Sequence, residues 1–422
     1  MQTLDWVVMK IAKVLFAPGK SAFFSDDQRA VKHGAPHDGF AYKGEPITPG
    51  FRSIREPGES ISVLLLLEDG QIAVGDCAAV AYSGAGGRDP IFRAEVYLPL
   101  LKEAVRPLLE QTDIGSFGEM ADRFERMTFA GKRLHTALRY GLSQALLDAR
   151  AKEQAKLKCE VLSEEFGLPL SAERIPVLAQ SGDNRYEHVD KMILKEVDVL
   201  PHGLINSIDN KLGRRGEKLK EYVSWIVKRI KHLRPNGRYS PTLHIDVYGT
   251  IGDLFDSDAN RISDYLATLE EDADGLELFI EGPVDMEQKA LQIETLARIR
   301  GRLRSLGSRV KIVADEWCNT LEDIKDFVDA RACDMVQIKT PDLGGIQNTV
   351  EAIRYAKDNA VGAYQGGTCN ETDVSARCCV HVALAARPDR MLAKPGMGFD
   401  EGFAIVNNEM ERIITILCSR KT

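Results

Sequence analysis

Four short apolar segments in the middle of the chain each end in a charged residue. The segments read LHIDVYGT, LELFIEGP, VKIVADEW and MVQIKTPDLGG, and their charged residues are Asp246, Glu281, Asp315 and Lys339. These residues stand 35, 34 and 24 positions apart, which leaves room for a loop, an amphipathic helix and a return to the next strand. A strand that is buried on both faces normally excludes charge. Charged groups at the same point of successive strands therefore predict one shared site.

The same rhythm begins at Ile175 and runs through eight candidate strands. They read IPVLAQSG, VDVLPHGLINS, LHIDVYGT, LELFIEGP, VKIVADEW, MVQIKTPD, VGAYQGGT and RMLAKPG. Eight parallel strands that alternate with helices close into a barrel, and the chemistry of such barrels lies at the carboxyl ends of the strands. His202 stands near the end of the second strand and so joins the four charged residues at that edge.

Residues 1–170 show no such repeat and mix strands with helices. Val7–Phe16 predicts a strand, and the apolar segments on either side of Asp69 and Gly70 predict a β-hairpin. Apolar residues then recur at helical spacing over 90–110, 117–127 and 134–151. We therefore predict an α/β protein with an α+β capping domain over residues 1–170 and a (β/α)₈ barrel over residues 171–422.

The composition narrows the class of protein. A chain of 422 residues exceeds the usual size of one hydrophobic core, which agrees with two unequal domains. The formal net charge of −8 disfavours nucleic acid or an anionic membrane as the main partner. No apolar run approaches the roughly 20 residues of a membrane span, and the first residues lack the order of a signal peptide. Eight cysteines without a CxxC pair predict reduced thiols in a cytoplasmic enzyme that acts on a small molecule.

Three carboxylates at neighbouring strand ends favour a hard divalent cation. Oxygen ligands without a histidine among them suit Mg²⁺, or Mn²⁺ in its place, better than zinc, and they leave coordination positions for water or substrate. A helix cap or a salt bridge is the ordinary alternative for any one of Asp246, Glu281 and Asp315. Their common position in three successive strands favours the metal site.

Lys339 admits three roles, which are structural support, Schiff-base nucleophile and general base. Burial and a neighbouring cation both disfavour the ammonium form, so we expect the pKa of Lys339 to be lowered toward the neutral range. A Schiff-base enzyme needs no group of carboxylates beside its amine, so the general base is favoured. Gln337 lies two residues earlier on the same strand and points to the same face, the barrel interior.

Four further features are interpreted without a catalytic role. The glycine-rich loop at 84–87 lacks the full dinucleotide-binding spacing, so we expect a flap over the barrel mouth. The basic segment 211–238 has apolar residues at helical spacing and predicts a barrel helix with a solvated charged face. His244 lies two residues before Asp246 on the same face and is a candidate to support a metal ligand. Cys369 has no base nearby in sequence, so we do not expect a nucleophile there.

Longer strings make the chain resemble a known family. HIDVYGTIG, IEGP, ADEWCNT, QIKTPDLGG, YQGGTCNET and LAKPGMG, with AQSGD, LPHGLIN, GESISVLLLLEDGQIAVGDCAAV and YSGAGGRDP before them, are similar to the methylaspartate ammonia-lyase (3-methylaspartase) family of the enolase superfamily. The resemblance covers nearly the whole chain from Met9 and implies an enolase-type capping domain. Superfamily members of the muconate-cycloisomerase type carry Lys-x-Lys at the end of the second strand, where this chain has His202.

The resemblance implies a role for each residue that matches the motifs of the family. Asp246, Glu281 and Asp315 correspond to Mg²⁺ ligands, Lys339 to the principal base and His202 to the group on the opposite face of the substrate. A histidine that is only hydrogen-bonded at the barrel rim is the ordinary alternative for His202. The residues implied to contact the substrate are Gln180, Gln337, Thr368, Cys369, Ala81 and Leu392.

Two of these substrate-binding positions carry further expectations. Thr368 and Cys369 precede the seventh barrel helix, and the free N–H groups of a helix amino terminus attract a carboxylate. The family has a glutamine before Tyr82 that contacts the amine end of the substrate, whereas this chain has Ala81. We therefore expect Ala81 to widen the range of amines that the site accepts.

The activity implied by the resemblance is the reversible, Mg²⁺-dependent loss of ammonia from L-threo-3-methylaspartate to give mesaconate. The proton at C3 is removed and a metal-stabilised enolate forms. The resemblance also implies a homodimer and a place in glutamate degradation, and it allows a K⁺ site. Two alternatives stay open, namely another superfamily enzyme such as a cycloisomerase or acid-sugar dehydratase, and a non-catalytic barrel that binds a dicarboxylate.

Overall fold

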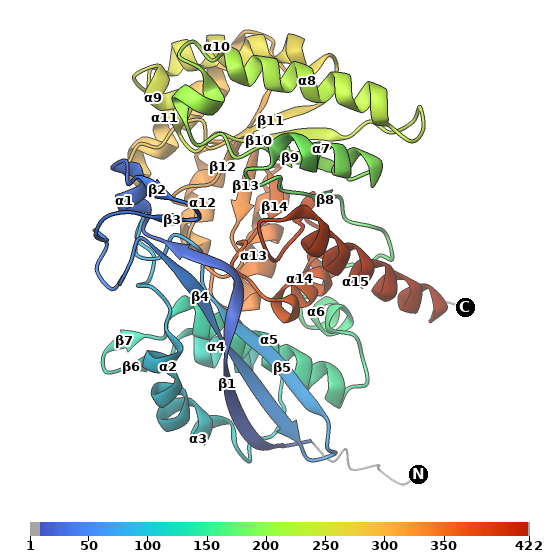
Figure 1. The fold of residues 1–422 in the computed structure, drawn as a ribbon. Coiled ribbons are helices and arrows are strands. Elements are labelled where there is room, and N and C mark those ends of the chain that lie inside the picture. The colour runs from blue at the N-terminus through green and yellow to red at the C-terminus, as the bar shows by residue number, and fades with distance from the viewer. Residues whose placement is uncertain (1–8, 421–422) are drawn as a thin grey trace.

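Eight parallel strands close into a barrel in a computed structural model of the chain, which describes residues 9–420 (Figure 1). The barrel strands are β8 (Val177–Leu178), β9 (Val199–His202), β10 (Thr242–Asp246), β11 (Leu278–Glu281), β12 (Lys311–Ala314), β13 (Met335–Ile338), β14 (Gly362–Gln365) and β15 (Arg390–Leu392). The ring closes where β15 pairs with β8. Seven of these strands lie within the segments that the sequence predicts, and β10 begins one residue before its segment, so the predicted barrel is confirmed.

Helices follow the strands and cover the outside of the barrel. They are α7 (Arg185–Leu194), the π-helix η2 (Ile208–Leu212), α8 (Glu217–Leu233), α9 (Thr250–Leu254), α10 (Ala259–Ala273), α11 (Lys289–Ser305), α12 (Leu321–Asp329), α13 (Ile346–Asp358), α14 (Asp373–Ala386) and α15 (Phe399–Ser419). Along α8, Leu219 and Ile226 are buried whereas Lys218 and Lys228 are exposed. This confirms the amphipathic barrel helix predicted for the basic segment. Within residues 9–420, no helix is long and apolar enough to cross a membrane.

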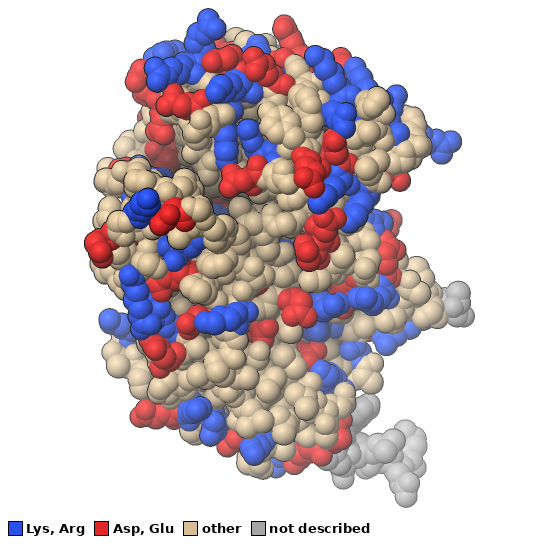
Figure 2. Space-filling model, viewed as in Figure 1, with Lys and Arg blue, Asp and Glu red and all other residues tan. Residues whose placement is uncertain are grey.

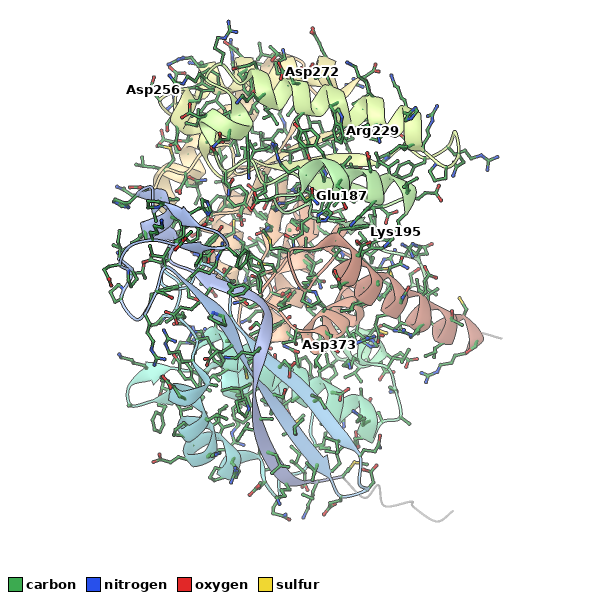
Figure 3. The ribbon with its side chains drawn as sticks, in the orientation of Figure 1. Glu187, Lys195, Arg229, Asp256, Asp272 and Asp373 are labelled. Atoms are coloured by element: carbon green, nitrogen blue, oxygen red, sulfur yellow. The ribbon has the colours of Figure 1, made fainter. Side chains whose placement is uncertain are left out.

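The outer faces of these helices carry charges of both signs. On the side that Figure 2 shows, Lys and Arg side chains alternate with Asp and Glu over the barrel helices. Glu187 of α7, Lys195 directly after α7 and Arg229 of α8 lie on this surface (Figure 3). Arg229 forms an ion pair with Asp190 at 2.5 Å. These side chains therefore form the solvated faces of helices whose apolar sides pack on the barrel.

A smaller sheet lies at the other end of the molecule and consists of β1 (Ile11–Asp26), β4 (Arg55–Leu67) and β5 (Ile72–Ala78) in the order β1-β4-β5 (Figure 1). Its strands are antiparallel, and β4 and β5 form the predicted hairpin around Asp69 and Gly70. The predicted strand Val7–Phe16 is too short, because β1 pairs with β4 along most of its length and continues to Asp26. Residues 7 and 8 of that prediction lie outside the described residues.

Helices and short strands complete this part of the chain. The helices are α1 (Gln28–Lys32), α2 (Ala94–Leu100), the π-helix η1 (Leu101–Val105), α3 (Arg106–Leu109), α4 (Phe117–Glu125), α5 (Thr136–Glu153) and α6 (Lys158–Phe166). The short strands are β2 (His37–Asp38), β3 (Ala41–Tyr42), β6 (Thr128–Phe129) and β7 (Lys132–Arg133). The three predicted helical segments are confirmed. The sequence analysis missed α6.

Helix α5 packs closely on β5 because two glycines face each other. A Cβ atom added at Gly141 of α5 would lie 2.5 Å from the backbone N of Cys77. A Cβ atom added at Gly75 of β5 would overlap the carbonyl oxygen of Gly141. The close approach allows α5, most of which is buried, to carry Tyr140 from the small sheet to the barrel, where its hydroxyl bonds Glu371 at 2.7 Å.

We expect Gly141→Ala to lower the free energy of unfolding by about 1–3 kcal/mol, because the added methyl group overpacks the contact between α5 and β5. Gly301 is the matched control. It is exposed within α11, and a Cβ there meets nothing within 4 Å. Gly301→Ala should stabilise the protein by up to about 1 kcal/mol, since alanine is the better helix former. Urea denaturation of both variants tests this, and equal effects would show that the contact tolerates a methyl group.

Candidate active site at the carboxyl ends of the barrel strands

The charged residues singled out in the sequence meet at one edge of the barrel. His202, Asp246 and Glu281 are the last residues of β9, β10 and β11, and Asp315 and Lys339 lie one residue beyond β12 and β13. All except Glu281 line a cavity of about 620 Å³, whose walls come from both the barrel and residues before 100. Glu281 is fully buried. The predicted convergence at the carboxyl ends of the strands is confirmed.

The three carboxylates resist being charged together. Burial raises the pKa of Asp246, and the charge of Asp315 raises it further. Burial likewise raises the pKa of Glu281, with added repulsion from Asp246 and Asp315. The pKa of Asp315 is also raised by burial, although Lys339 acts in the opposite direction. A divalent cation between the three carboxylates would offset both the cost of burying their charges and the repulsion between them. The donor set therefore fits the hard cation that the sequence predicts.

The positions of the ligand atoms differ from the expected trio. Donor atoms of His202, Asp246 and Glu281 lie within 4.8 Å of one another. The carboxylate of Asp315 instead forms an ion pair with Lys339, with 2.5 Å between Oδ1 and Nζ. The structure thus brings the three carboxylates to one site, and Asp315 lies on the side toward the lysine.

Glu281 is oriented by hydrogen bonds from the adjacent strand β10 and from β13. Nε2 of Gln337 donates to its Oε1 at 2.7 Å, and Nε2 of His244 lies 2.6 Å from its Oε2. Burial and the charge of Arg390 hold the pKa of His244 well below its usual value. The guanidinium of Arg390 lies 3.0 Å from Nδ1, so the neutral imidazole carries its proton on Nε2 and donates it to Glu281. His244 therefore supports a candidate metal ligand, as predicted.

The expected lowering of the pKa of Lys339 is wrong for the protein alone. Burial does act to lower the pKa of the ammonium, but the charges of Asp315 and Glu316 outweigh it, and the pKa is raised. Glu316 is charged in turn. Burial opposes its ionisation, whereas Lys339 and Arg88 lower its pKa to about 2. The sequence analysis considered burial and a cation but not these two acidic neighbours.

His202 lies on the cavity wall as a neutral imidazole. Burial and the charge of Lys339 lower its pKa to about 4. Its Nε2 lies 3.4 Å from Oδ2 of Asp246. The backbone of His202 has φ of +63°, a conformation that residues other than glycine seldom adopt, and it directs the side chain from the end of β9 into the cavity. A neutral imidazole in this position can accept a proton at neutral pH.

The residues implied to contact substrate all line the same cavity. They are Ala81, Gln180, Gln337, Thr368, Cys369 and Leu392. Nε2 of Gln180 already donates to the carbonyl oxygen of Gly396 at 2.9 Å. Burial raises the pKa of Cys369 to about 12, which agrees with the expectation that its thiol is not a nucleophile.

The expected use of a helix amino terminus at Thr368 and Cys369 is wrong. Helix α14 begins only at Asp373, and the hydroxyl of Thr372 caps it by accepting the N–H of Ser375. The hydroxyl of Thr368 instead accepts the N–H of Asn370 at 3.2 Å within the preceding loop. Any substrate contact in this region therefore comes from the loop, because the helix caps its own first turn.

The glycine-rich loop at 84–87 reaches the barrel mouth, as predicted, and is fastened there by residues that the sequence analysis missed. The side chain of Arg88 is 4% exposed, and its Nε donates to Asp342 at 2.8 Å while a second nitrogen lies 3.4 Å from Glu316. Nδ2 of Asn319 donates to the carbonyl oxygen of Gly86 at 2.6 Å. In the sequence, this contact is signalled only by Arg88, a single basic residue directly after the glycines.

Aromatic residues form much of the remaining cavity wall and were also missed. They are Phe23, Phe40, Tyr42, Tyr82, Tyr248 and Tyr364. Phe23 lies in β1, Phe40 and Tyr42 lie in the segment around β3, and Tyr82 lies in the loop before Arg88. Tyr248 follows β10, and Tyr364 lies in β14. No motif marks such residues, because only the folded chain brings them to one cavity.

Comparisons with known proteins match the chain along nearly its full length. Residues 9–167 match the family described as methylaspartate ammonia-lyase N-terminus, and residues 169–419 match methylaspartate ammonia-lyase C-terminus. A relative named methylaspartate ammonia-lyase from Citrobacter amalonaticus is 61% identical over 409 residues, which cover 97% of this chain and 99% of the relative.

Solved structures show the same similarity. The structure of the Citrobacter amalonaticus methylaspartate ammonia-lyase containing (2S,3S)-3-methylaspartic acid has a TM-score of 0.96 and 60% identity, covering 97% of this chain and 99% of that one. A magnesium complex of β-methylaspartase from Clostridium tetanomorphum has a TM-score of 0.93 and 53% identity, covering 98% of this chain and all of the other.

Proposed function

This chain belongs to the methylaspartate ammonia-lyase family, and we propose that it catalyses the reversible removal of ammonia from L-threo-3-methylaspartate to give mesaconate. The observation that carries the proposal is the meeting of three buried carboxylates with a lysine and a neutral histidine at one cavity. Removal of a weakly acidic proton next to a carboxylate requires a base, and a cation that stabilises the negative charge as it develops. This site has a base beside carboxylates that can hold such a cation. The family match assigns the amino acid on which this chemistry acts.

We propose that Asp246, Glu281 and Asp315 hold Mg²⁺. Their raised pKa values and the orientation of Glu281 by His244 and Gln337 support this assignment. Mg²⁺ bound there supplies positive charge to the substrate carboxylate, on which negative charge develops when the neighbouring C–H is broken. The magnesium complex of the Clostridium tetanomorphum relative provides independent support.

We propose that Lys339 removes the proton at C3. In the protein alone, Asp315 is the nearest anion to Lys339 and the main attraction that raises its pKa. When Asp315 serves a cation instead, that attraction weakens and the amine becomes available as a base. We therefore expect a lowered pKa of Lys339 in the metal-loaded protein rather than in the protein alone.

We propose that His202 acts on the opposite face of the substrate. Its imidazole is neutral because burial and Lys339 lower its pKa to about 4, so it can accept the proton of the other C3 diastereomer. Gln180, Gln337, Thr368, Cys369 and Leu392 surround the space between the two bases and are proposed to hold the substrate, as the family resemblance implies.

We also propose the wider context that the family resemblance implies. The chain then forms a homodimer in the cytoplasm, takes part in glutamate degradation, accepts Mn²⁺ in place of Mg²⁺ and has room for a K⁺ site. The proposed division into a capping domain, 1–170, and a catalytic barrel, 171–422, is supported by the position of α6 before it and β8 after it.

The assay of this function is release of mesaconate, an unsaturated acid that absorbs ultraviolet light, from L-threo-3-methylaspartate with Mg²⁺ present. EDTA should abolish the activity and added Mg²⁺ should restore it. Asp246→Asn, Glu281→Gln and Asp315→Asn should each lower kcat on the order of 100-fold or more, as loss of a fixed electrostatic group does. Asp253→Asn, an exposed carboxylate of α9, is the control and should keep full activity. Undiminished turnover in EDTA would exclude the metal assignment.

The two proposed bases should be separable by hydrogen exchange. Lys339→Ala should abolish exchange of the C3 proton of the threo substrate with deuterium, because it removes the amine that takes this proton. His202→Ala should retain that exchange and mainly alter stereochemical fidelity. NMR spectroscopy of the substrate in deuterium oxide measures both effects. Equal loss of both exchange reactions in each variant would contradict the division of labour.

Ala81 should widen the range of amines. It lines the cavity beside Tyr82, and its carbonyl oxygen accepts the N–H of Asp26 at 2.9 Å, which fixes the backbone at this point. A glutamine there can hydrogen-bond ammonia, and a lost contact of this kind costs about 1–3 kcal/mol, or on the order of 10- to 100-fold in kcat/KM. The space left by alanine can bury an alkyl group, which returns about 0.8 kcal/mol per CH₂.

Ala81→Gln should therefore raise kcat/KM for ammonia and lower it for alkyl amines when mesaconate is the acceptor. Competition between ammonia and an alkyl amine, run on both proteins, gives the ratio directly. The Mg²⁺ requirement should not change, since Ala81 is not among the carboxylates of the site. A ratio that stays constant would show that Ala81 does not border the amine.

A further inference from the structure

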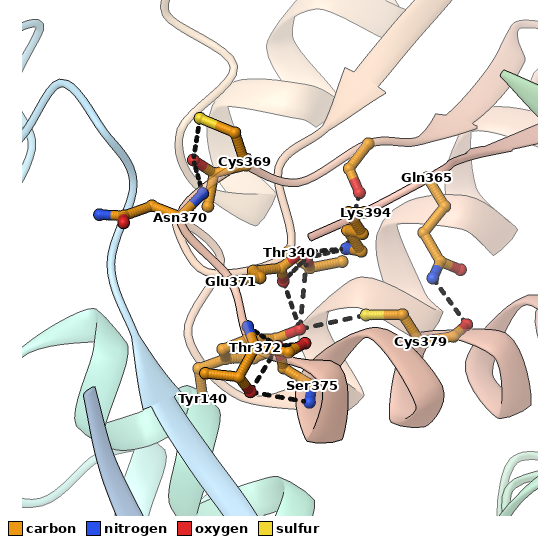
Figure 4. Close-up of polar contacts among 12 residues, drawn as sticks. Tyr140, Thr340, Gln365, Cys369, Asn370, Glu371, Thr372, Ser375, Cys379 and Lys394 are labelled. Atoms are coloured by element: carbon orange, nitrogen blue, oxygen red, sulfur yellow. Dashed lines mark hydrogen bonds and ion pairs between the residues drawn. The ribbon is translucent and has the colours of Figure 1, made fainter. Parts of the chain in front are cut away.

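A fully buried lysine lies behind the cavity wall and takes no part in the chemistry described above. Lys394 follows β15 by two residues and has no exposed surface. Its ammonium group has three partners (Figure 4). Nζ donates to Oγ1 of Thr340 at 2.9 Å and to the carbonyl oxygen of Gly366 at 2.9 Å, and it forms an ion pair with Glu371 at 2.7 Å. Two hydrogen bonds and one ion pair therefore hold the ammonium group.

These partners belong to two segments that the active site needs. Thr340 directly follows Lys339, the proposed base. Gly366 and Glu371 bound a loop, here called the 366–371 loop, whose Thr368 and Cys369 line the cavity. One ammonium group thus connects the strand end that carries the base to the two ends of the loop that faces the substrate.

The 366–371 loop is shaped around this ammonium group. Gly367 has φ of +142°, and a Cβ atom added there would overlap Nζ of Lys394. Glycine is therefore needed both for the backbone conformation and for the close approach. On the far side of Lys394, the N–H of Gly396 donates to the carbonyl oxygen of Cys369 at 2.8 Å, so the segment after β15 holds the middle of the loop as well.

The ion pair is completed by a residue from outside the barrel. Oε1 of Glu371 accepts the hydroxyl of Tyr140 of α5 at 2.7 Å and the hydroxyl of Thr340 at 2.9 Å (Figure 4). Burial acts to lower the pKa of Lys394, but its interactions with Cys379 and Glu371 outweigh burial and raise the pKa, so the group stays charged. A buried ion pair contributes little net stability compared with apolar packing, and its best-supported use is to specify one arrangement.

We propose that Lys394 is a positioning residue, whose buried ammonium group holds the 366–371 loop at a fixed place relative to Lys339. The loop can then present Thr368 and Cys369 to a substrate whose C3 proton lies at the lysine. This proposal rests on the proposed function for its effect on catalysis. Its effect on the loop is independent of any activity.

The test is the paired substitution Lys394→Met with Glu371→Gln, which removes both charges while keeping the side-chain sizes. Hydrogen–deuterium exchange with mass spectrometry should show about tenfold faster exchange in peptides that cover the 366–371 loop, with strand β11 unchanged. In the mesaconate assay, KM for 3-methylaspartate should rise about tenfold, because binding contacts of the loop are lost. The Mg²⁺ concentration for half-maximal activity should stay the same.

The matched control removes a partly buried ion pair whose residues do not line the cavity. Nζ of Lys158 lies 3.0 Å from Oδ1 of Asp148, between α6 and α5. Lys158→Met with Asp148→Asn should lower the melting temperature without changing KM or the exchange of the loop. An effect on KM as large as that of the Lys394 pair would reduce Lys394 to a general stabilising role and overturn the proposal.

A milder variant can be used if the paired variant does not fold. Thr340→Val keeps the ion pair between Lys394 and Glu371 but removes one hydroxyl that accepts a hydrogen bond from the ammonium group. Hydrogen exchange of the loop and KM should then change in the same direction by a smaller factor. Unchanged loop exchange in the folded variants, or faster exchange with the original KM, would overturn the proposal. An unmodified chain that releases no mesaconate would instead refute the proposed function, and the exchange measurement would still decide the role of Lys394.

Discussion

The repulsion among Asp246, Glu281 and Asp315 is the constraint on which the rest of the site depends. Burial raises the pKa of all three acids at the ends of these neighbouring strands, and the charge of Asp315 raises the pKa of Asp246 and of Glu281 further. Such an arrangement weakens the folded protein unless positive charge or hydrogen bonds compensate for it. His244, Gln337 and Lys339 supply part of that compensation, and a divalent cation would supply the remainder. The site is therefore built for a cation, whereas His202 beside it is kept neutral by burial and by the charge of Lys339.

The segments outside the barrel keep this site enclosed. Arg88 joins the glycine-rich loop to Asp342 and Glu316 at the barrel mouth, and Glu316 is the residue next to the proposed ligand Asp315. Tyr140 reaches the buried ion pair of Lys394 and Glu371 from helix α5, whose close packing on β5 depends on two glycines. The capping segments therefore contact both the charged edge of the barrel and the loop that faces the substrate.

The sequence predicted the barrel and its chemical edge because both leave local signals. Each strand is a short apolar run, and each proposed ligand or base ends such a run, so Asp246, Glu281 and Lys339 could be found without coordinates. Arg88 and Lys394 could not, because their roles arise from contacts with residues more than 20 and up to 254 positions away. The pKa of Lys339 was misjudged for the same reason, since its acidic neighbours depend on side-chain geometry. The sequence also led us to expect a carboxylate site at the amino terminus of the helix after Thr368 and Cys369, but that helix begins only at Asp373, and Thr372 already accepts the N–H of Ser375 there.

The central claim is that the three carboxylates form one cation site beside Lys339. A crystal of the protein grown with Mn²⁺ as a substitute for Mg²⁺ tests it most directly, because manganese can be located by its anomalous scattering. The account predicts a single strong peak within coordination distance of Asp246, Glu281 and Asp315, with Asp315 turned from Lys339 toward the ion. A peak elsewhere in the cavity, or an Asp315 that keeps its ion pair with Lys339 while manganese is bound, would contradict it.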